Sequence, residues 1–125
     1  MQNLLFVVIG AGIGGGMRYY ISGLSFRFLP EVFPWGTLLV NVIGSFLLGL
    51  IIFAGIERIA SPPHIKNLLT TGFCGGFTTF STFSLETINL LRSSEYLYAL
   101  LNITGNVVLS LLAIIAALYI SKVTV

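Results

Sequence analysis

Long apolar stretches separated by short polar loops run along the whole chain. The apolar stretches cover residues 3–24, 35–56, 65–91 and 96–120. A helix that crosses a bilayer needs about 20 mostly apolar residues. The loops hold the prolines, which end helices, and most of the charges. The pattern therefore predicts an all-α integral membrane protein, with four transmembrane helices in a single domain over residues 1–125.

Composition supports this fold class. Hydrophobic residues make up 56% of the chain and charged residues only 8%, whereas a soluble domain carries roughly 25% charged residues. The first apolar stretch follows no basic segment and has no obvious small-residue cleavage site, so we expect a membrane span rather than a signal peptide. The net charge of +2 is too small and scattered for a nucleic-acid surface. Cys74 is the sole cysteine, so no intrachain disulfide forms.

Residues 72–84 read GFCGGFTTFSTFS and lie inside the third apolar stretch. Its three glycines are poor helix formers and cost about 1 kcal/mol each relative to alanine. We therefore expect the third span to break at residues 75–79. Broken helix at membrane depth is tolerated only where it is buried in protein or lines a wet cavity. The break thus predicts a permeation or binding site.

Two polar stripes have helical spacing: Thr37, Asn41 and Ser45 in the second span, and Asn102, Asn106 and Ser110 in the fourth. Polar residues in spans usually face the interior of the bundle, although serine, threonine and asparagine also join helices to one another. For Ser45 we favour a helix contact. For Asn41 we favour a site, because its amide has two N–H donors that need partners.

The third span adds aromatic rings and hydroxyls. Phe80 and Phe83 share a helix face, and Ser81, Thr82 and Ser84 follow the break on an adjacent face. An isolated phenylalanine pair is usually core packing, but here it accompanies hydroxyls, an amide and ring edges with partial positive charge. Such neutral donors suit a small anion that must be desolvated without being trapped. The sequence has no Ser/His/Asp set, paired carboxylates or metal cluster, so we expect no enzyme.

The basic residues are balanced across the predicted membrane. Arg58, Lys66 and Lys122 lie on the side of the termini, and Arg18, Arg27 and Arg92 lie towards the other side. An excess of basic residues on one side normally fixes orientation. Without it the chain can insert both ways, and two opposed copies can form an antiparallel, dual-topology homodimer with two-fold symmetry. The alternative is a weak bias that still gives one orientation.

Three segments resemble the Fluc (CrcB-type) family of fluoride ion channels: GGGMRY (14–19), GTLLVNVIGS (36–45) and GFCGGFTTFSTFS (72–84). The resemblance covers the whole chain. It implies an antiparallel homodimer with two pores in the cell's inner (plasma) membrane. Such a channel passively exports cytoplasmic fluoride and so relieves fluoride toxicity.

The resemblance also implies roles for individual residues. It implies a fluoride pore formed by Thr37, Asn41, Phe80, Ser81, Thr82, Phe83 and Ser84. Within that set the two phenylalanines form an aromatic box and the hydroxyls a track. It implies a structural Na⁺ at the dimer centre, held by the backbone carbonyls of Gly75 and Thr78, and it places Arg18 near a vestibule. Asn102, Asn106 and Ser110 correspond more loosely.

Two other functions remain open. A four-span, dual-topology exporter of small cations would need an acidic residue inside a span. Glu86 is the candidate, but it lies towards the end of the third span, where a salt bridge or an interfacial position also explains it. A non-transporting accessory subunit would lack polar stripes that face a pore. Fluoride and chloride flux in liposomes would separate the three.

Overall fold

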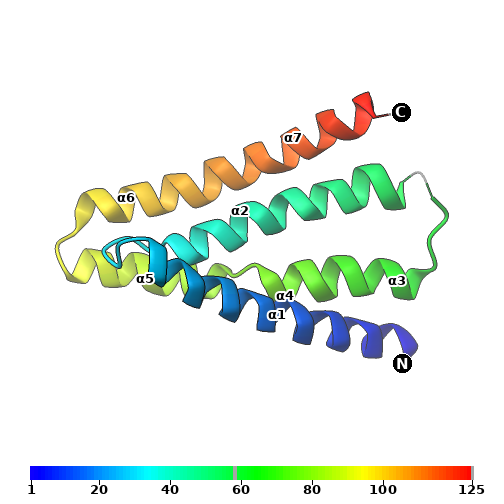
Figure 1. Ribbon diagram of the computed structural model, residues 1–125, viewed down its shortest axis with the longest axis horizontal. Helices are drawn as coiled ribbons and strands as arrows, with labels where there is room; N and C mark the ends of the chain where they lie inside the picture. The colour runs from blue at the N-terminus through cyan, green and yellow to red at the C-terminus, as the bar shows by residue number, and fades with distance from the viewer. Residues whose placement is uncertain (58, 125) are drawn as a thin grey trace.

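The computed structural model describes residues 1–57 and 59–124, and every regular element in these residues is helical. The helices run roughly along one long axis (Figure 1). In chain order they are α1 (Gln2–Phe28), α2 (Trp35–Leu50), η1 (Ile51–Ile56), α3 (Pro63–Asn67), η2 (Leu68–Cys74), α4 (Gly75–Phe77), α5 (Phe80–Arg92), α6 (Tyr96–Thr104), η3 (Gly105–Leu109) and α7 (Ser110–Val123). The η elements are π-helical turns that continue the adjoining α-helices.

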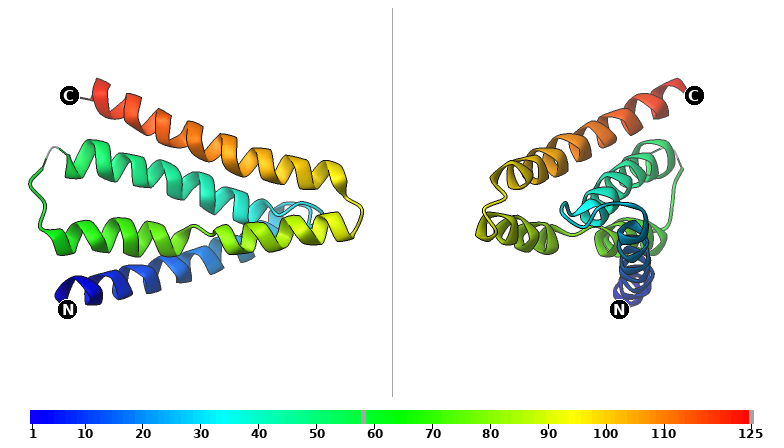
Figure 2. Two further views of the ribbon diagram at one scale, coloured as in Figure 1. Left: turned by 180° about the vertical axis from the view of Figure 1, so that it is seen from behind. Right: turned by 60° about the vertical axis from the view of Figure 1, so that its left-hand side comes forward.

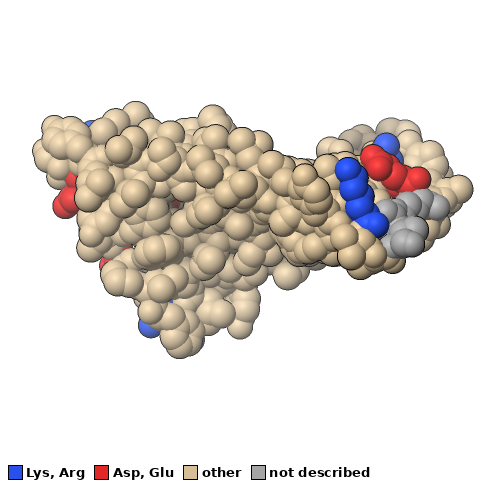
Figure 3. Space-filling model, turned by 90° about the horizontal axis from the view of Figure 1, so that it is seen from above, with Lys and Arg blue, Asp and Glu red and all other residues tan. Residues whose placement is uncertain are grey.

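Three helices of the described chain are long and apolar enough to cross a membrane: Gln2–Phe28, Trp35–Ile56 and Tyr96–Val123. They contain three of the four predicted spans. The remaining span, 65–91, is interrupted between α4 and α5, so the crossing that it would make stays a prediction. Lys, Arg, Asp and Glu side chains gather mainly near the two ends of the molecule, with a long uncharged surface between them (Figure 3).

The order of the helices places both termini at one end. The end of η1 and the start of α3 lie at that same end, whereas α5 turns into α6 at the opposite end (Figures 1 and 2). The turn into α6 is tight, and Ser94 within it has a φ of 59°. Arg58, one of the basic residues in the charge balance, lies outside the described residues.

The interruption of the third predicted span is confined to two threonines. Thr78 (φ −89°, ψ 160°) and Thr79 (φ −150°, ψ 123°) are extended, whereas Gly72, Gly75 and Gly76 lie within helical elements. The break therefore falls at the end of the predicted 75–79 range. Our expectation that the glycines themselves would break the helix was wrong.

The glycines instead allow the first half of this span to approach α1 closely. A Cβ on Gly76 would lie 2.6 Å from the carbonyl oxygen of Ala11, and one on Gly72 would lie 2.9 Å from that of Val7. On the facing side, a Cβ on Gly14 would collide with the carbonyl oxygen of Phe73. Small residues permit this kind of backbone approach in membranes. Glycine is required here for packing rather than for flexibility.

The two halves of the broken span pack against different helices. η2 and α4 lie along α1, whereas α5 lies along α6. α2 packs along α7, where a Cβ on Gly49 would lie 2.7 Å from the Cβ of Ala117. Buried side chains at the centre include Phe77 and Val40, which are almost inaccessible. The break therefore lies at the junction of two packing arrangements.

Candidate functional site

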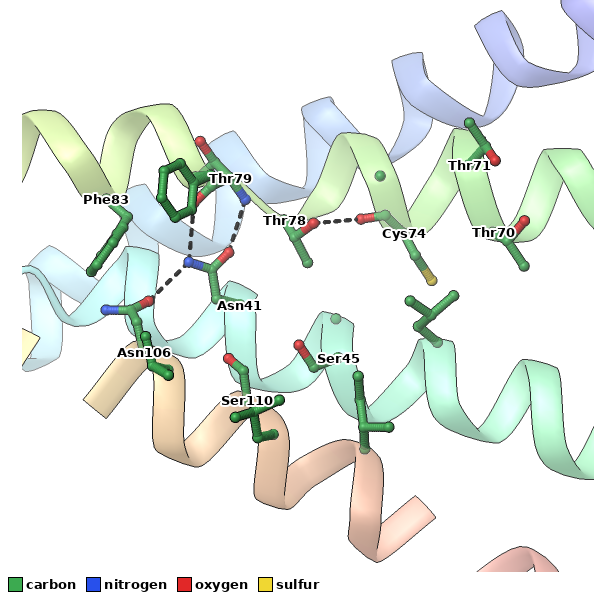
Figure 4. Close-up of a pocket in the computed structure, with 17 residues that line it drawn as sticks. Asn41, Ser45, Thr70, Thr71, Cys74, Thr78, Thr79, Phe83, Asn106 and Ser110 are labelled. Carbon is green, nitrogen blue, oxygen red and sulfur yellow. Dashed lines mark hydrogen bonds between the residues drawn. The ribbon is translucent and has the colours of Figure 1, made fainter. Parts of the chain in front are cut away.

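A cavity of about 640 Å³ lies beside the break, between α2, η2, α4 and the η3–α7 helix (Figure 4). Hydroxyls, amides, a thiol and aromatic rings share its wall with aliphatic side chains. The described lining residues include no charged side chain: Asn41, Gly44, Ser45, Leu48, Thr70, Thr71, Cys74, Gly75, Thr78, Thr79, Phe80, Phe83, Asn106, Val107, Ser110, Leu111 and Ile114. The second span, the fourth span and the break meet at this cavity.

Asn41 holds the break together. Its Oδ1 accepts a hydrogen bond from the backbone N–H of Thr79 at 2.8 Å, and its Nδ2 donates to the carbonyl of Thr79 at 3.1 Å. The second Nδ2 donor bonds to Oδ1 of Asn106 at 2.9 Å. A helix break frees backbone groups that need partners, and Asn41 supplies both partners at Thr79. As we expected, its amide faces the broken span, but both of its N–H donors are occupied.

The hydroxyls that follow the break form a cap for α5. The side chain of Thr79 accepts from the backbone N–H of Thr82 at 3.2 Å, as an N-cap residue does. Its hydroxyl also lies 3.1 Å from that of Thr82 and 3.4 Å from that of Ser81. Ser84 bonds back to the carbonyl of Phe80 at 2.9 Å. Ser81, Thr82 and Ser84 thus cluster at the start of α5 rather than in the described wall of the cavity, and their pore role stays a prediction.

Phe80 and Phe83 share a face, as their spacing predicts. Their ring centroids are 5.4 Å apart, with an interplanar angle of 55°, and both rings line the cavity. They differ in environment, because Phe83 is 8% exposed and Phe80 is 77% exposed. The chain alone buries one ring of the pair and leaves the other open.

Thr37 lies away from this cavity. Its hydroxyl donates to the carboxylate of Glu86 on α5. Glu86 lines a smaller cavity of about 240 Å³, together with Glu31 and Asn89. The polar stripe of α2 therefore divides: Asn41 and Ser45 line the cavity beside the break, whereas Thr37 bonds to Glu86.

Arg18 reaches from α1 to the break. Its Nε donates to the carbonyl oxygen of Gly76 at 3.2 Å. Gly75 and Thr78 line the cavity, and the Thr78 hydroxyl bonds to the carbonyl of Cys74 at 2.9 Å. No group of three or more His, Cys, Asp or Glu side chains that would hold a metal is found among the described residues.

Sequence comparison identifies the family. A family model described as "CrcB-like protein, Camphor Resistance (CrcB)" matches residues 5–118. The chain belongs to the CrcB family. Proteins named fluoride-specific ion channel FluC are similar to this CrcB chain over nearly its full length. The protein from Magnetococcus marinus is 42% identical over 121 residues, covering 97% of this chain and 98% of the relative. That from Pyrococcus abyssi is 48% identical over 116 residues, covering 89% of each. The predicted resemblance is confirmed, and the apolar helices of this CrcB chain agree with a membrane protein.

Two residues of the CrcB chain that make side-chain hydrogen bonds were not singled out by sequence reasoning. Thr79 is both the break and the cap of α5, and a hydroxyl residue just before a helical stretch is the signal that would have found it. Thr87 accepts a hydrogen bond from the buried amide of Asn102 at 3.0 Å. A single threonine in an apolar span gave no signal of that contact, because its partner lies on another helix.

Proposed function

We propose that this chain is the subunit of a passive, fluoride-selective ion channel and not an enzyme. The observation that carries the proposal is its similarity, over nearly the whole length, to proteins named fluoride-specific ion channels. The relative from Hydrogenobaculum sp., for example, is 44% identical over 111 residues. The cavity beside the break supports the proposal, since its described wall offers neutral donors and ring edges without a charged group.

The chemistry of that wall suits a small anion that must bind and leave. Hydroxyl donors, together with an amide N–H that exchanges its present partner, would replace part of the hydration shell of fluoride, and the positive edges of Phe80 and Phe83 add a weak attraction. Binding in a conducting pathway has to be favourable enough for entry but weak enough for release. A cation exporter would instead require an acidic group where the cation binds. Glu86 lies at the smaller cavity, bonded to Thr37, so the main cavity gives that alternative no support.

The proposed channel has four crossings per chain and works as an antiparallel homodimer. The position of both termini at one end agrees with an even number of crossings. The exposed ring of Phe80 supports the dimer, because an aromatic box needs both rings enclosed and one chain encloses only Phe83. Reporter fusions at the C-terminus test the topology. They should report both orientations, and a single orientation would contradict the antiparallel arrangement.

A structural Na⁺ at the dimer centre also belongs to the proposal. Arg18 and Asn41 occupy the carbonyls of Gly76 and Thr79, whereas Gly75 and Thr78, which are proposed to hold the ion, lie in the cavity wall. Two breaks related by a two-fold axis would double these carbonyls into an all-oxygen donor set, which fits a hard cation. If Na⁺ binds only the dimer, replacing it with N-methylglucamine should lower dimer stability. Dimer stability indifferent to every cation tested would remove Na⁺ from the proposal.

The experiment that tests the function itself is flux from liposomes. Purified protein in vesicles loaded with fluoride or chloride should release fluoride much faster than chloride, without an energy source. We propose the same direction in cells, from the cytoplasm outward across the inner membrane. Equal release of both anions, or release of neither, would refute the proposal.

A further inference from the structure

A directional chain of hydrogen bonds leads from the break into the fourth span. It starts at the backbone N–H of Thr79, which donates to Oδ1 of Asn41 at 2.8 Å. Nδ2 of Asn41 then donates to Oδ1 of Asn106 at 2.9 Å (Figure 4). The Asn106 amide therefore accepts from the one N–H of Asn41 that does not bond to Thr79.

The series of hydrogen bonds continues through two residues that are absent from the walls of both cavities described above. Nδ2 of Asn106 donates to Oδ1 of Asn102 at 2.9 Å and to the backbone carbonyl of Asn102 at 2.8 Å. Nδ2 of Asn102 in turn donates to the hydroxyl of Thr87 at 3.0 Å. The Thr87 hydroxyl donates to the backbone carbonyl of Phe83 at 2.8 Å. Each group accepts from the previous one and donates to the next, so the bonds polarise one another in the same direction.

The middle of this chain is shielded from solvent. Asn102 is 0% exposed, Asn106 6% and Thr87 7%. A buried amide that loses a partner cannot replace it with water, so partial disruption of such a network is costly. The network joins the break, which Asn41 holds, to the backbone of Phe83, whose ring lines the same cavity.

Both N–H donors of Asn41 are occupied, which sets a condition for any contact between this amide and fluoride. For Asn41 to donate to fluoride, one N–H has to leave either the carbonyl of Thr79 or Oδ1 of Asn106. The bond to Thr79 is the longer, at 3.1 Å against 2.9 Å, and Thr79 keeps a second bond to Asn41 through its own N–H. An exchange at the Thr79 carbonyl thus leaves the amide held between Thr79 and Asn106.

We propose that Asn102 and Thr87 are positioning residues for fluoride conduction. They fix Asn106, which keeps the Asn41 amide in place while one of its N–H groups changes partner. Thr87 also links this network to the turn of α5 that carries Phe83, through its bond to the Phe83 backbone carbonyl. The inference rests on the proposed function, because it assumes that fluoride passes this cavity.

Thr87→Val tests the proposal without altering the described wall of the main cavity. Valine has the same shape but lacks the hydroxyl, so Nδ2 of Asn102 loses its acceptor. Thr87→Ser keeps the hydroxyl and serves as the rescue variant. Thr104→Val is the matched control. The Thr104 hydroxyl also donates to a carbonyl of its own helix, that of Leu100 at 2.8 Å, but Thr104 is exposed and takes no part in this series of hydrogen bonds.

Two measurements are made on each variant as the reconstituted full-length protein. Fluoride flux per channel should fall about tenfold in Thr87→Val, which corresponds to about 1.4 kcal/mol in barrier height, and the ratio of fluoride to chloride permeability should fall with it. The side-chain amide resonance of Asn41, followed by NMR, should shift. Thr87→Ser should restore both readouts, and Thr104→Val should leave both at wild-type values.

A folded Thr87→Val variant with wild-type flux, permeability ratio and Asn41 resonance would overturn the proposal. Lower thermal stability with those readouts unchanged would overturn it too, because it would show a merely structural role. If Thr87→Val does not fold, Thr87→Cys replaces it, since a thiol is a weak donor and acceptor and should give a smaller shift in the same direction. Wild-type vesicles without fluoride flux would refute the proposed function and this inference together, whereas wild-type flux matched by Thr87→Val refutes the inference alone.

Discussion

Replacing Asn41 with aspartate should abolish fluoride flux, and the structure also gives the cost to the fold. Aspartate keeps the acceptor for the Thr79 N–H but loses both donors. The carbonyl of Thr79 and Oδ1 of Asn106 then face a carboxylate oxygen across distances that are now 3.1 and 2.9 Å. A partly buried acceptor left without its donor costs about 1–3 kcal/mol. Two of them cost about 2–6 kcal/mol, a large share of a typical stability of about 5–15 kcal/mol.

This cost means that flux has to be measured together with stability. We expect Asn41→Asp to lower the midpoint of thermal unfolding and to eliminate fluoride release from liposomes, even in the fraction that remains folded, because a negative charge repels the anion. Asn41→Ser keeps one donor and should retain part of the flux. Asn3→Asp makes the same chemical change at an exposed position and should alter neither readout. Wild-type flux in folded Asn41→Asp would show that Asn41 only joins helices.

Three further predictions concern side-chain packing and backbone conformation. Phe80→Ile and Phe83→Ile should both reduce fluoride flux strongly, and the change at Phe83, which one chain already buries, should also lower thermal stability. Unchanged flux in both variants would return the rings to simple packing. Gly76→Ala should lower the midpoint of thermal unfolding and the fraction of protein that migrates as a dimer in detergent. Gly12→Ala, where a Cβ meets no described atom within 4 Å, should change neither. Ser94→Gly should raise stability by about 1 kcal/mol, because only glycine adopts a φ of 59° freely; a lower unfolding midpoint would contradict this.

The sequence predicted the helices well where local signals decide them. Pro34 immediately precedes α2, and the polar residues 93–95 separate α5 from α6, so the predicted starts at Trp35 and Tyr96 agree with those observed. The end of the second span at Ile56 also agrees. These boundaries depend on residues next to them in the chain, which is why hydropathy and turn chemistry find them.

The location of the break could not be predicted in the same way. Local propensity pointed to the glycines, but close packing against α1 holds Gly72 and Gly76 in helical conformation. The extended backbone of Thr79 is held by Asn41, 38 positions away in the sequence. Such a partner is visible only when the helices are assembled. The same holds for Thr87, whose partner Asn102 lies on another helix.

The close seam between α1 and the first half of the broken span has a consequence for biosynthesis. Arg18 and Gly76, which meet across that seam, are separated by 58 positions in the chain. At about 5–20 residues per second, Gly76 follows Arg18 out of the ribosome about 3–12 s later. During that time the face of α1 that carries Gly10 and Gly14 has only lipid, or another protein, to cover it. Membrane insertion factors that shield small-residue faces would therefore encounter α1 before its own chain can, and slower translation should lengthen that encounter.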